Sequence, residues 1–226
     1  MKLVNAAHAA PVTLRHPSTD GFLVLAAEVG RWAGPIPAPS RTRRRLLDGI
    51  GTACGRLASR SDVLEAVTFR GALRPPGEGA ELLAHSGVRP ARYDVVVQIR
   101  TADVDHVRRD WYLFNYFHGR STETVFDVWK YTAGWFQRHT MVANSTLLRP
   151  IVGEPVDYRV INHASWPTLR QFLPTLALRP SFRSFVLANF AANGVAAQPI
   201  IYRVARREPG EHPRQQRRDE QHEQHP

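Results

Sequence analysis

Two asparagines and a tryptophan in the second half of the chain are the residues best placed to do chemistry. In an extended strand alternate residues share a face, so Tyr158 and Asn162 point the same way and Trp166 continues that face. Asn115, two residues before Phe117, is a second amide in a strand-like sequence. A carboxamide among apolar side chains can donate hydrogen bonds to a ligand oxygen and stabilise negative charge that develops there. The alternative is that each amide bonds the neighbouring backbone and that the tryptophan is a core residue.

The histidines and the known catalytic motifs offer less. His118 and His163 suit proton transfer near neutral pH, but no carboxylate partner is evident for either, and His163 falls on the strand face opposite Asn162. The chain has no metal-ligand spacing, no glycine-rich phosphate loop and no nucleophile elbow. We therefore expect a site without a metal and without a cofactor.

The elements that must position these residues follow the order β-α-β-β-α-β across residues 110–205, a complete ferredoxin-like unit in an α+β fold. Aromatic residues favour a first strand, and Ser121 is suited to cap the helix after it. Val125, Trp129, Thr132 and Phe136 recur at helical spacing, which predicts that one face of this helix packs on the sheet. The predicted elements are a strand over 111–118, a helix from 121, strands over 142–148 and 158–163, a helix from Trp166 to Ala192 interrupted near Pro180, and a strand over 198–204.

Residues 21–109 predict only part of a second such unit. A segment at 21–29 fits either a strand or a buried helix. A helix that Ser40 is suited to cap follows it, and then two strands. Residues 101–109 are too few for the missing helix and strand. We expect the strand at 93–100 to be a sheet edge, which native proteins rarely leave bare. Residues 111–117 or a second subunit would cover it, so the sequence allows a homo-oligomer.

Three local sequences join the element order in pointing to a family: Asn162-His-Ala-Ser-Trp166, Leu178-Arg-Pro-Ser-Phe-Arg183 and Gln198-Pro-Ile-Ile-Tyr202. With them, residues 110–205 resemble the antibiotic biosynthesis monooxygenase-like family of the dimeric α+β barrel superfamily. The resemblance implies that two ferredoxin-like halves form one barrel, the first half being diverged and incomplete. This fold hosts many reactions, so function inferred from it is analogy.

The resemblance also implies a site and an activity. Asn162 would hydrogen-bond a substrate phenol, or the anion formed from it, and Trp166 would wall the pocket; these are the expected catalytic residues. Asn115, Phe117 and Tyr158 are the expected substrate contacts. The implied activity is cofactor-independent monooxygenation of a small aromatic, polyketide-like compound, which needs a cavity of several hundred Å³ beside Asn162. The alternative is a non-catalytic binding or structural barrel, filled by its own aromatic side chains.

The haem-degrading branch of the same superfamily does not fit this sequence. That branch needs a tryptophan six residues before the phenylalanine of its second helix and a histidine four residues after it. When the chain is aligned on Phe182, those positions hold Leu176 and Val186. Neither side chain can ligate iron or distort a macrocycle.

Composition narrows the partners and the compartment. The net charge is +10, but almost all of the positive charge is arginine and no recognition motif accompanies it, so we expect no nucleic-acid partner. No run of eighteen apolar residues is present, so we expect no membrane partner. The single Cys54 favours a reducing, cytoplasmic location. Residues 1–20 are predicted to be loose, and residues 206–226, which lack apolar side chains, to form a disordered tail.

Overall fold

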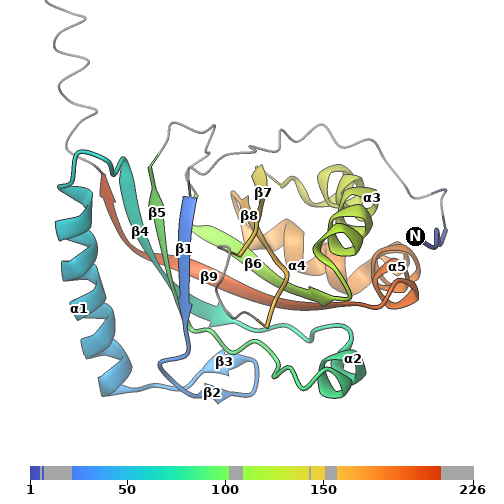
Figure 1. Cartoon of the computed structure of the whole chain (residues 1–226), viewed down its shortest axis with the longest axis horizontal. Helices are drawn as coiled ribbons and strands as arrows, with labels where there is room; N and C mark the ends of the chain where they lie inside the picture. The colour runs from blue at the N-terminus through green and yellow to red at the C-terminus, as the bar shows by residue number, and fades with distance from the viewer. Residues whose placement is uncertain (6, 8–21, 102–108, 143, 151–156, 210–226) are drawn as a thin grey trace, which may run out of the picture. The chain divides into compact units, whose positions relative to one another are not determined.

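The structure, a computed structural model, describes residues 1–5, 7, 22–101, 109–142, 144–150 and 157–209. The fold is α+β, with antiparallel strands and helices, as predicted (Figure 1). The chain divides into two compact units whose residues alternate along the sequence. Among the described residues, no helix is both long enough and apolar enough to cross a membrane.

Unit 1 contains the strands and helices predicted for the second half of the chain. Its strand order is β9-β6-β8-β7, and both β6 and β7 run antiparallel to β8. Helices supply much of the buried apolar cluster that packs on the β6–β8 sheet. Its elements are α2 (Ala80–His85), β6 (Trp111–Gly119), α3 (Thr122–Thr140), β7 (Asn144–Leu148), β8 (Val160–Trp166), α4 (Leu169–Leu178), η2 (Phe182–Leu187), α5 (Ala188–Ala192) and β9 (Val195–Pro209) as far as Tyr202.

Helix α3 begins where the sequence predicts. The Ser121 hydroxyl accepts the N–H of Thr124 at 3.2 Å, which satisfies a backbone donor that the first helical turn leaves without a partner. Trp129 and Thr132, which share the predicted apolar face, are both buried. This face holds α3 against the sheet that carries Asn115 and Asn162.

The helical region after β8 starts later than predicted and is less regular. Trp166 is the last residue of β8 and does not begin a helix, because Thr168 is the N-cap of α4 and its hydroxyl accepts the N–H of Arg170 at 3.3 Å. The break near Pro180 is confirmed, since α4 ends at Leu178. The next segment, η2, is a π-helix that continues into α5. Gly194, at φ +60°, follows the end of α5.

Residues Leu73–Ala91 also belong to unit 1, although they lie in the first half of the sequence. Glu78 exchanges two backbone hydrogen bonds with Ala197 of β9, at 2.8 and 3.0 Å. The next residue must be glycine, because Gly79 has φ +79° and a Cβ there would lie 2.7 Å from Ala196. Helix α2 follows directly and was not predicted.

Unit 2 contains antiparallel strands and one long helix. Its strand order is β1-β5-β4, and Ser40 caps α1 as predicted by accepting the N–H of Arg43 at 3.2 Å. Cys54 lies in a small core cluster with Ala58 and Ala66, as expected for a free cysteine that packs as an apolar residue. The elements are β1 (Phe22–Ala27), β2 (Trp32–Ala33), β3 (Ile36–Pro37), α1 (Arg41–Ala58), β4 (Glu65–Leu73) up to Ala72, β5 (Val95–Arg100) and the end of β9.

Two sequence predictions for these strands were wrong. Residues 93–100 do not form a sheet edge, because β5 lies between β1 and β4 and pairs with both of them. The disordered tail was predicted to begin at residue 206, which is too early, because β9 continues to Pro209. Arg207 forms an ion pair with the buried Glu65 at 3.0 Å, so a charged residue is held in the strand. Residues 210–226 lie outside the described part of the chain.

Candidate functional site

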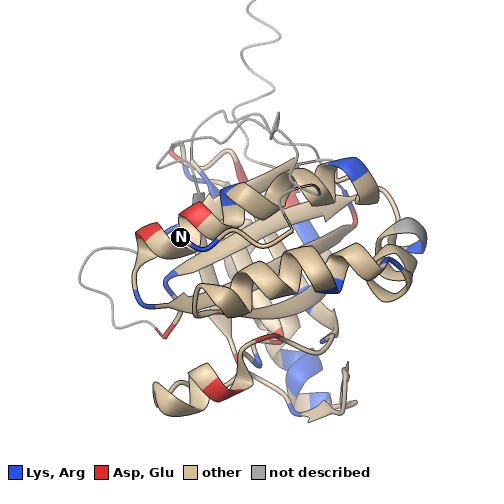
Figure 2. Ribbon diagram, turned by 90° about the vertical axis from the view of Figure 1, so that its right-hand side faces the viewer, with Lys and Arg blue, Asp and Glu red and all other residues tan. Residues whose placement is uncertain are grey.

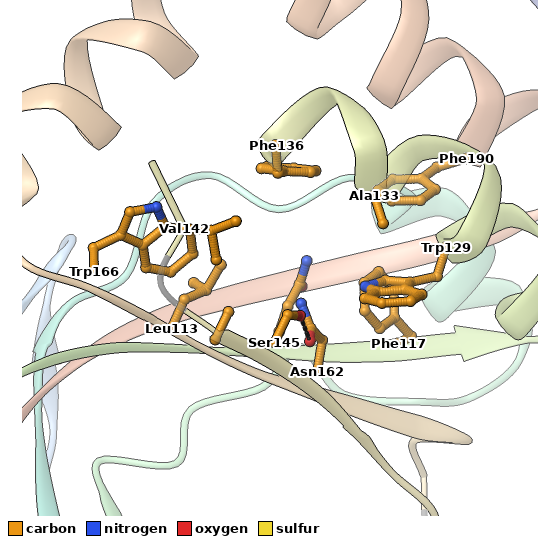
Figure 3. Close-up of a pocket in the computed structure, with 12 residues that line it drawn as sticks. Leu113, Phe117, Trp129, Ala133, Phe136, Val142, Ser145, Asn162, Trp166 and Phe190 are labelled. Carbon is orange, nitrogen blue, oxygen red and sulfur yellow. Dashed lines mark hydrogen bonds between the residues drawn. The ribbon is translucent and has the colours of Figure 1, made fainter. Parts of the chain in front are cut away.

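A small pocket in unit 1 lies between the β6–β8 sheet and helix α3 (Figure 3). Two polar residues of the pocket are brought together by the register of β6 and β8, in which Asn115 is directly opposite Asn162. In the same register Trp166 is opposite Trp111. The described residues that line the pocket carry no formal charge. They are Leu113, Asn115, Phe117, Trp129, Ala133, Phe136, Val142, Ser145, Asn162, Ala164, Trp166 and Phe190.

Three polar side chains stand on the sheet side of this otherwise apolar pocket. Ser145 donates its hydroxyl to the Asn162 carbonyl oxygen at 2.7 Å, so the Asn162 amide nitrogen keeps its two N–H groups for other acceptors (Figure 3). The Oδ1 atom of Asn115 is buried and has no hydrogen-bond partner among the described residues. A buried amide oxygen left in this way is costly, so the site favours a water or a ligand that can donate to it.

Trp166 forms one wall of the pocket, and its packing and its indole hydrogen bond fix the side chain in place. It is 2% exposed, its ring centroid lies 4.2 Å from that of Phe172, and its indole N–H donates to the Thr140 hydroxyl at 3.1 Å. That hydroxyl in turn donates to the carbonyl of Phe136 at 2.7 Å. Figure 3 shows Trp166 at one end of the pocket and Trp129 with Phe117 at the other. Because its N–H is used, the tryptophan can offer a ligand its apolar ring.

The pocket is narrow. Its cavity has a volume of about 30 Å³ for the centres of water-sized molecules. About 10–15 Å³ of such space holds one water, whereas sites for drug-sized ligands span roughly 300–1,000 Å³. The expected cavity of several hundred Å³ beside Asn162 is therefore not present in this conformation. The reason is the apolar face of α3, whose Trp129 and Phe136 side chains occupy the space above the sheet.

The structure brings four of the five predicted site residues to this pocket: Asn115, Phe117, Asn162 and Trp166. It places the fifth elsewhere. Tyr158 precedes β8, packs its ring against Tyr116 with centroids 5.7 Å apart, and donates its hydroxyl to the Arg89 carbonyl at 2.7 Å.

The two candidate bases lie outside the pocket as well. His163 is on the other face of β8, where its ring stacks on that of Tyr112 with centroids 5.0 Å apart. His118 is half-buried, and its Nδ1 lies 2.7 Å from the carbonyl oxygen of Asp157. Proton transfer in the pocket would therefore not involve either ring in this arrangement.

Comparison with known proteins identifies no relative. No family model matches the chain, and neither a curated protein nor a solved structure matches it. The resemblance drawn from the sequence therefore stays a prediction. Within the part of the chain that the structure describes, no three His, Cys, Asp or Glu side chains gather as metal ligands would.

Ser145 belongs to the site but was not predicted from the sequence. Its role depends on the pairing of β7 with β8, where Ser145 is opposite Ala164, and local sequence patterns do not determine that register. Alternation along β7 could have placed it on a face with Leu147, but not against Asn162. Trp129 and Phe136 were predicted to face the sheet, and both line the pocket.

Proposed function

We propose that unit 1 is a ferredoxin-like module that binds a small, flat, apolar molecule carrying an oxygen, with the Asn115 and Asn162 amides as its polar contacts. The observation that carries this proposal is the pairing of the two amides across β6 and β8, facing an uncharged pocket that is otherwise apolar. The ferredoxin-like assignment is supported by the element order β-α-β-β-α-β and by the strand order β9-β6-β8-β7.

The lining determines which ligands are suitable. Because none of the described lining residues is charged, a charged ligand would lose its hydration without gaining a counter-ion from them. A neutral aromatic molecule would pack on Phe117 and Trp166. Its oxygen would accept a hydrogen bond from the Asn162 amide nitrogen, since the carbonyl of that amide is engaged by Ser145. A hydroxyl on the ligand could also donate to Asn115 Oδ1.

The activity that we propose is cofactor-independent monooxygenation of such a compound. An electron-rich phenolate would reduce dioxygen directly: a ring methylene becomes a carbonyl that takes one oxygen atom, and the second oxygen leaves as water with the two hydrogens. Negative charge develops on the ligand oxygen as the phenol passes its proton to water, since none of the described lining residues is a base. The Asn162 N–H groups would stabilise that charge, and the apolar walls would strengthen the interaction by excluding water.

A non-catalytic protein filled by its own side chains is the second candidate. The cavity of about 30 Å³ favours it, because a ring can enter only if Trp129 or Phe136 moves. Buried side chains of this size do not move without cost, since protein interiors are close-packed. Ligand entry is thus what separates the two candidates.

Oxygen uptake tests the proposed activity. The purified protein would be mixed with hydroxylated anthrones and quinols, without added flavin or metal, beside the variant Asn162→Ala. Uptake that is lost in the variant supports the oxygenase and its site. Equal uptake in both proteins means background oxidation and removes the site assignment. No uptake with any compound, while the compounds bind, leaves a binding protein without this reaction.

A further inference from the structure

Two asparagines at the end of the last helix of unit 1 hold the first residues of the chain by their backbone. Asn189, in α5, accepts the N–H of Val4 at 3.0 Å and donates to the carbonyl of Val4 at 2.9 Å. Asn193, which caps the helix, repeats the arrangement with Lys2, at 2.6 and 2.9 Å. Figure 1 shows the N-terminus beside α5. The two amides are spaced four residues apart on the helix and contact alternate residues of the segment.

This geometry is that of a strand edge. In an extended segment, the N–H and C=O of alternate residues point to one side, so residues 2 and 4 present the same edge to the helix. Each side-chain amide supplies one donor and one acceptor and so substitutes for a peptide group of a neighbouring strand. Recognition by main-chain hydrogen bonds is the principle of peptide binding by strand addition.

The helix itself orients both amides. Asn189 is fully buried, and its amide nitrogen also donates to the Phe185 carbonyl at 2.6 Å. The amide nitrogen of Asn193 donates to the Asn189 carbonyl at 2.8 Å. Side chains fixed in this way lose little freedom when a peptide binds. Removing the segment would leave the buried Asn189 carbonyl without its Val4 donor, which favours an occupant.

The side chains at positions 1 and 3 of the segment contribute little to these contacts. Met1 and Leu3 are each 60% exposed. Asn5 does make a contact of its own, because its amide donates to the Ser184 carbonyl. Figure 2 marks the N-terminus beside ribbon segments that carry acidic and basic residues, but the backbone contacts of residues 2 and 4 are made by the uncharged side chains of Asn189 and Asn193. The paired asparagines therefore bind the backbone of residues 2 and 4 with little regard to side chains at positions 1 and 3.

We propose that Asn189 and Asn193 form a binding site for an extended polypeptide, which the chain's own residues 1–5 occupy in this structure. The partner is an extended peptide segment of another protein, bound through the N–H and C=O groups of two residues that are two positions apart, as Lys2 and Val4 are here. The chain's own segment competes at a high effective concentration because it is tethered. A segment that is held by a few backbone hydrogen bonds and has exposed side chains opens at low cost, so exchange with another peptide is accessible.

The test uses full-length variants in which the segment is released. Lys2→Pro and Val4→Pro each remove one of the N–H donors, and the double variant removes both. Leu3→Pro is the matched control, because the N–H of Leu3 would point to the opposite edge of the segment. The probes are a fluorescent peptide Met-Lys-Leu-Val-Asn, a peptide Ser-Thr-Ser-Thr-Asn, and the first peptide N-methylated at its second and fourth residues. Binding is followed by fluorescence anisotropy.

The released variant should bind both unmethylated peptides roughly tenfold or more tightly than the wild type and the Leu3→Pro control. The methylated peptide should not bind. Adding Asn193→Ala to the released variant should weaken binding, and this half-buried position keeps the test usable if changes at Asn189 prevent folding. The proposal is overturned if the released variant, with a native circular dichroism spectrum, binds no peptide or binds the methylated one equally well. If the double variant does not fold, Lys2→Pro alone decides by the same criteria.

Discussion

Asn115 and Asn162 lie directly opposite each other on β6 and β8, and both side chains line the pocket that α3 covers. The two amides are not equivalent. Asn162 is engaged by Ser145, whereas the Oδ1 of Asn115 has no partner among the described residues. The Asn162 side chain is therefore held in place, and the Oδ1 atom of Asn115 is available to a ligand.

Ser145→Ala tests how strongly Asn162 is held. The substitution removes the donor of the 2.7 Å hydrogen bond and leaves a nearly buried carbonyl oxygen without it. We expect the free energy of unfolding to fall by about 1–2 kcal/mol in urea titrations. The double variant Ser145→Ala, Asn162→Leu should lose less than the sum of the two single changes, because the second change removes the stranded amide. Strict additivity would contradict the assigned contact.

Gly79→Ala tests the packing of the segment Leu73–Ala91 on β9. The residue has φ +79°, and a Cβ would lie 2.7 Å from backbone and side-chain atoms of Ala196. We expect a loss of unfolding free energy of about 2 kcal/mol or more, from backbone strain and overpacking together. Gly87→Ala is the control, because Gly87 has φ +68° with nothing within 4 Å of its Cβ position, so it should lose only about 1 kcal/mol. Equal losses would mean that the contact with β9 is not formed.

Arg43→Leu tests the buried ion pair of unit 2. Arg43 lies 2.6 Å from Asp94, whose side chain is 1% exposed and also accepts the N–H groups of Val29 and Gly30. Removing the arginine strands a buried carboxylate, so we expect a loss of about 3 kcal/mol in the free energy of unfolding. Arg44→Leu, at an exposed position of the same helix, should change it by less than about 0.5 kcal/mol. A small effect of Arg43→Leu would contradict the ion pair.

Glu123 makes the stability of α3 depend on pH. Hydrogen bonds from its own backbone N–H and from the Ser121 hydroxyl lower the pKa of Glu123 below its ordinary value. A lowered folded-state pKa stabilises the protein above the unfolded-state pKa of about 4.3, and this stabilisation is lost as the pH falls through the folded-state value. Urea titrations should thus show wild type more stable than Glu123→Gln at pH 6, with the difference disappearing under acid conditions. A difference that does not change with pH would be inconsistent with this account.

Local periodicity was sufficient to predict much of unit 1. The aromatic-rich sequence predicts β6, and the cap at Ser121 with the spacing of Trp129 and Phe136 predicts α3 and its packed face. The alternation of side chains along a strand places Asn115, Phe117, Asn162 and Trp166 on the pocket side, because each lies within a regular strand.

The errors occur where tertiary contacts override local patterns. Tyr158 does not share the face of Asn162, since β8 begins only at Val160 and the tyrosine is held by the Arg89 carbonyl. β9 extends through charged residues because Arg207 pairs with Glu65, more than a hundred positions earlier in the chain. Residues 1–5 were predicted to be loose because their sequence shows no periodicity. They are held instead by hydrogen bonds from their backbone to the side chains of Asn189 and Asn193, which no local pattern indicates.

Equilibrium binding of a hydroxylated anthrone, followed by tryptophan fluorescence, tests whether the pocket takes an aromatic ligand, because Trp129 and Trp166 line the pocket. We expect saturable binding at one equivalent, weakened about tenfold by Asn162→Ala and less by Tyr158→Phe, since Tyr158 lies outside the pocket. If Asn115 Oδ1 accepts the hydrogen of the phenol hydroxyl, a methyl ether of the same compound, which lacks that hydrogen, should bind more weakly than the free phenol. No binding, or binding that Asn162→Ala leaves unchanged, would contradict the proposed site and favour a protein whose interior is filled by its own side chains.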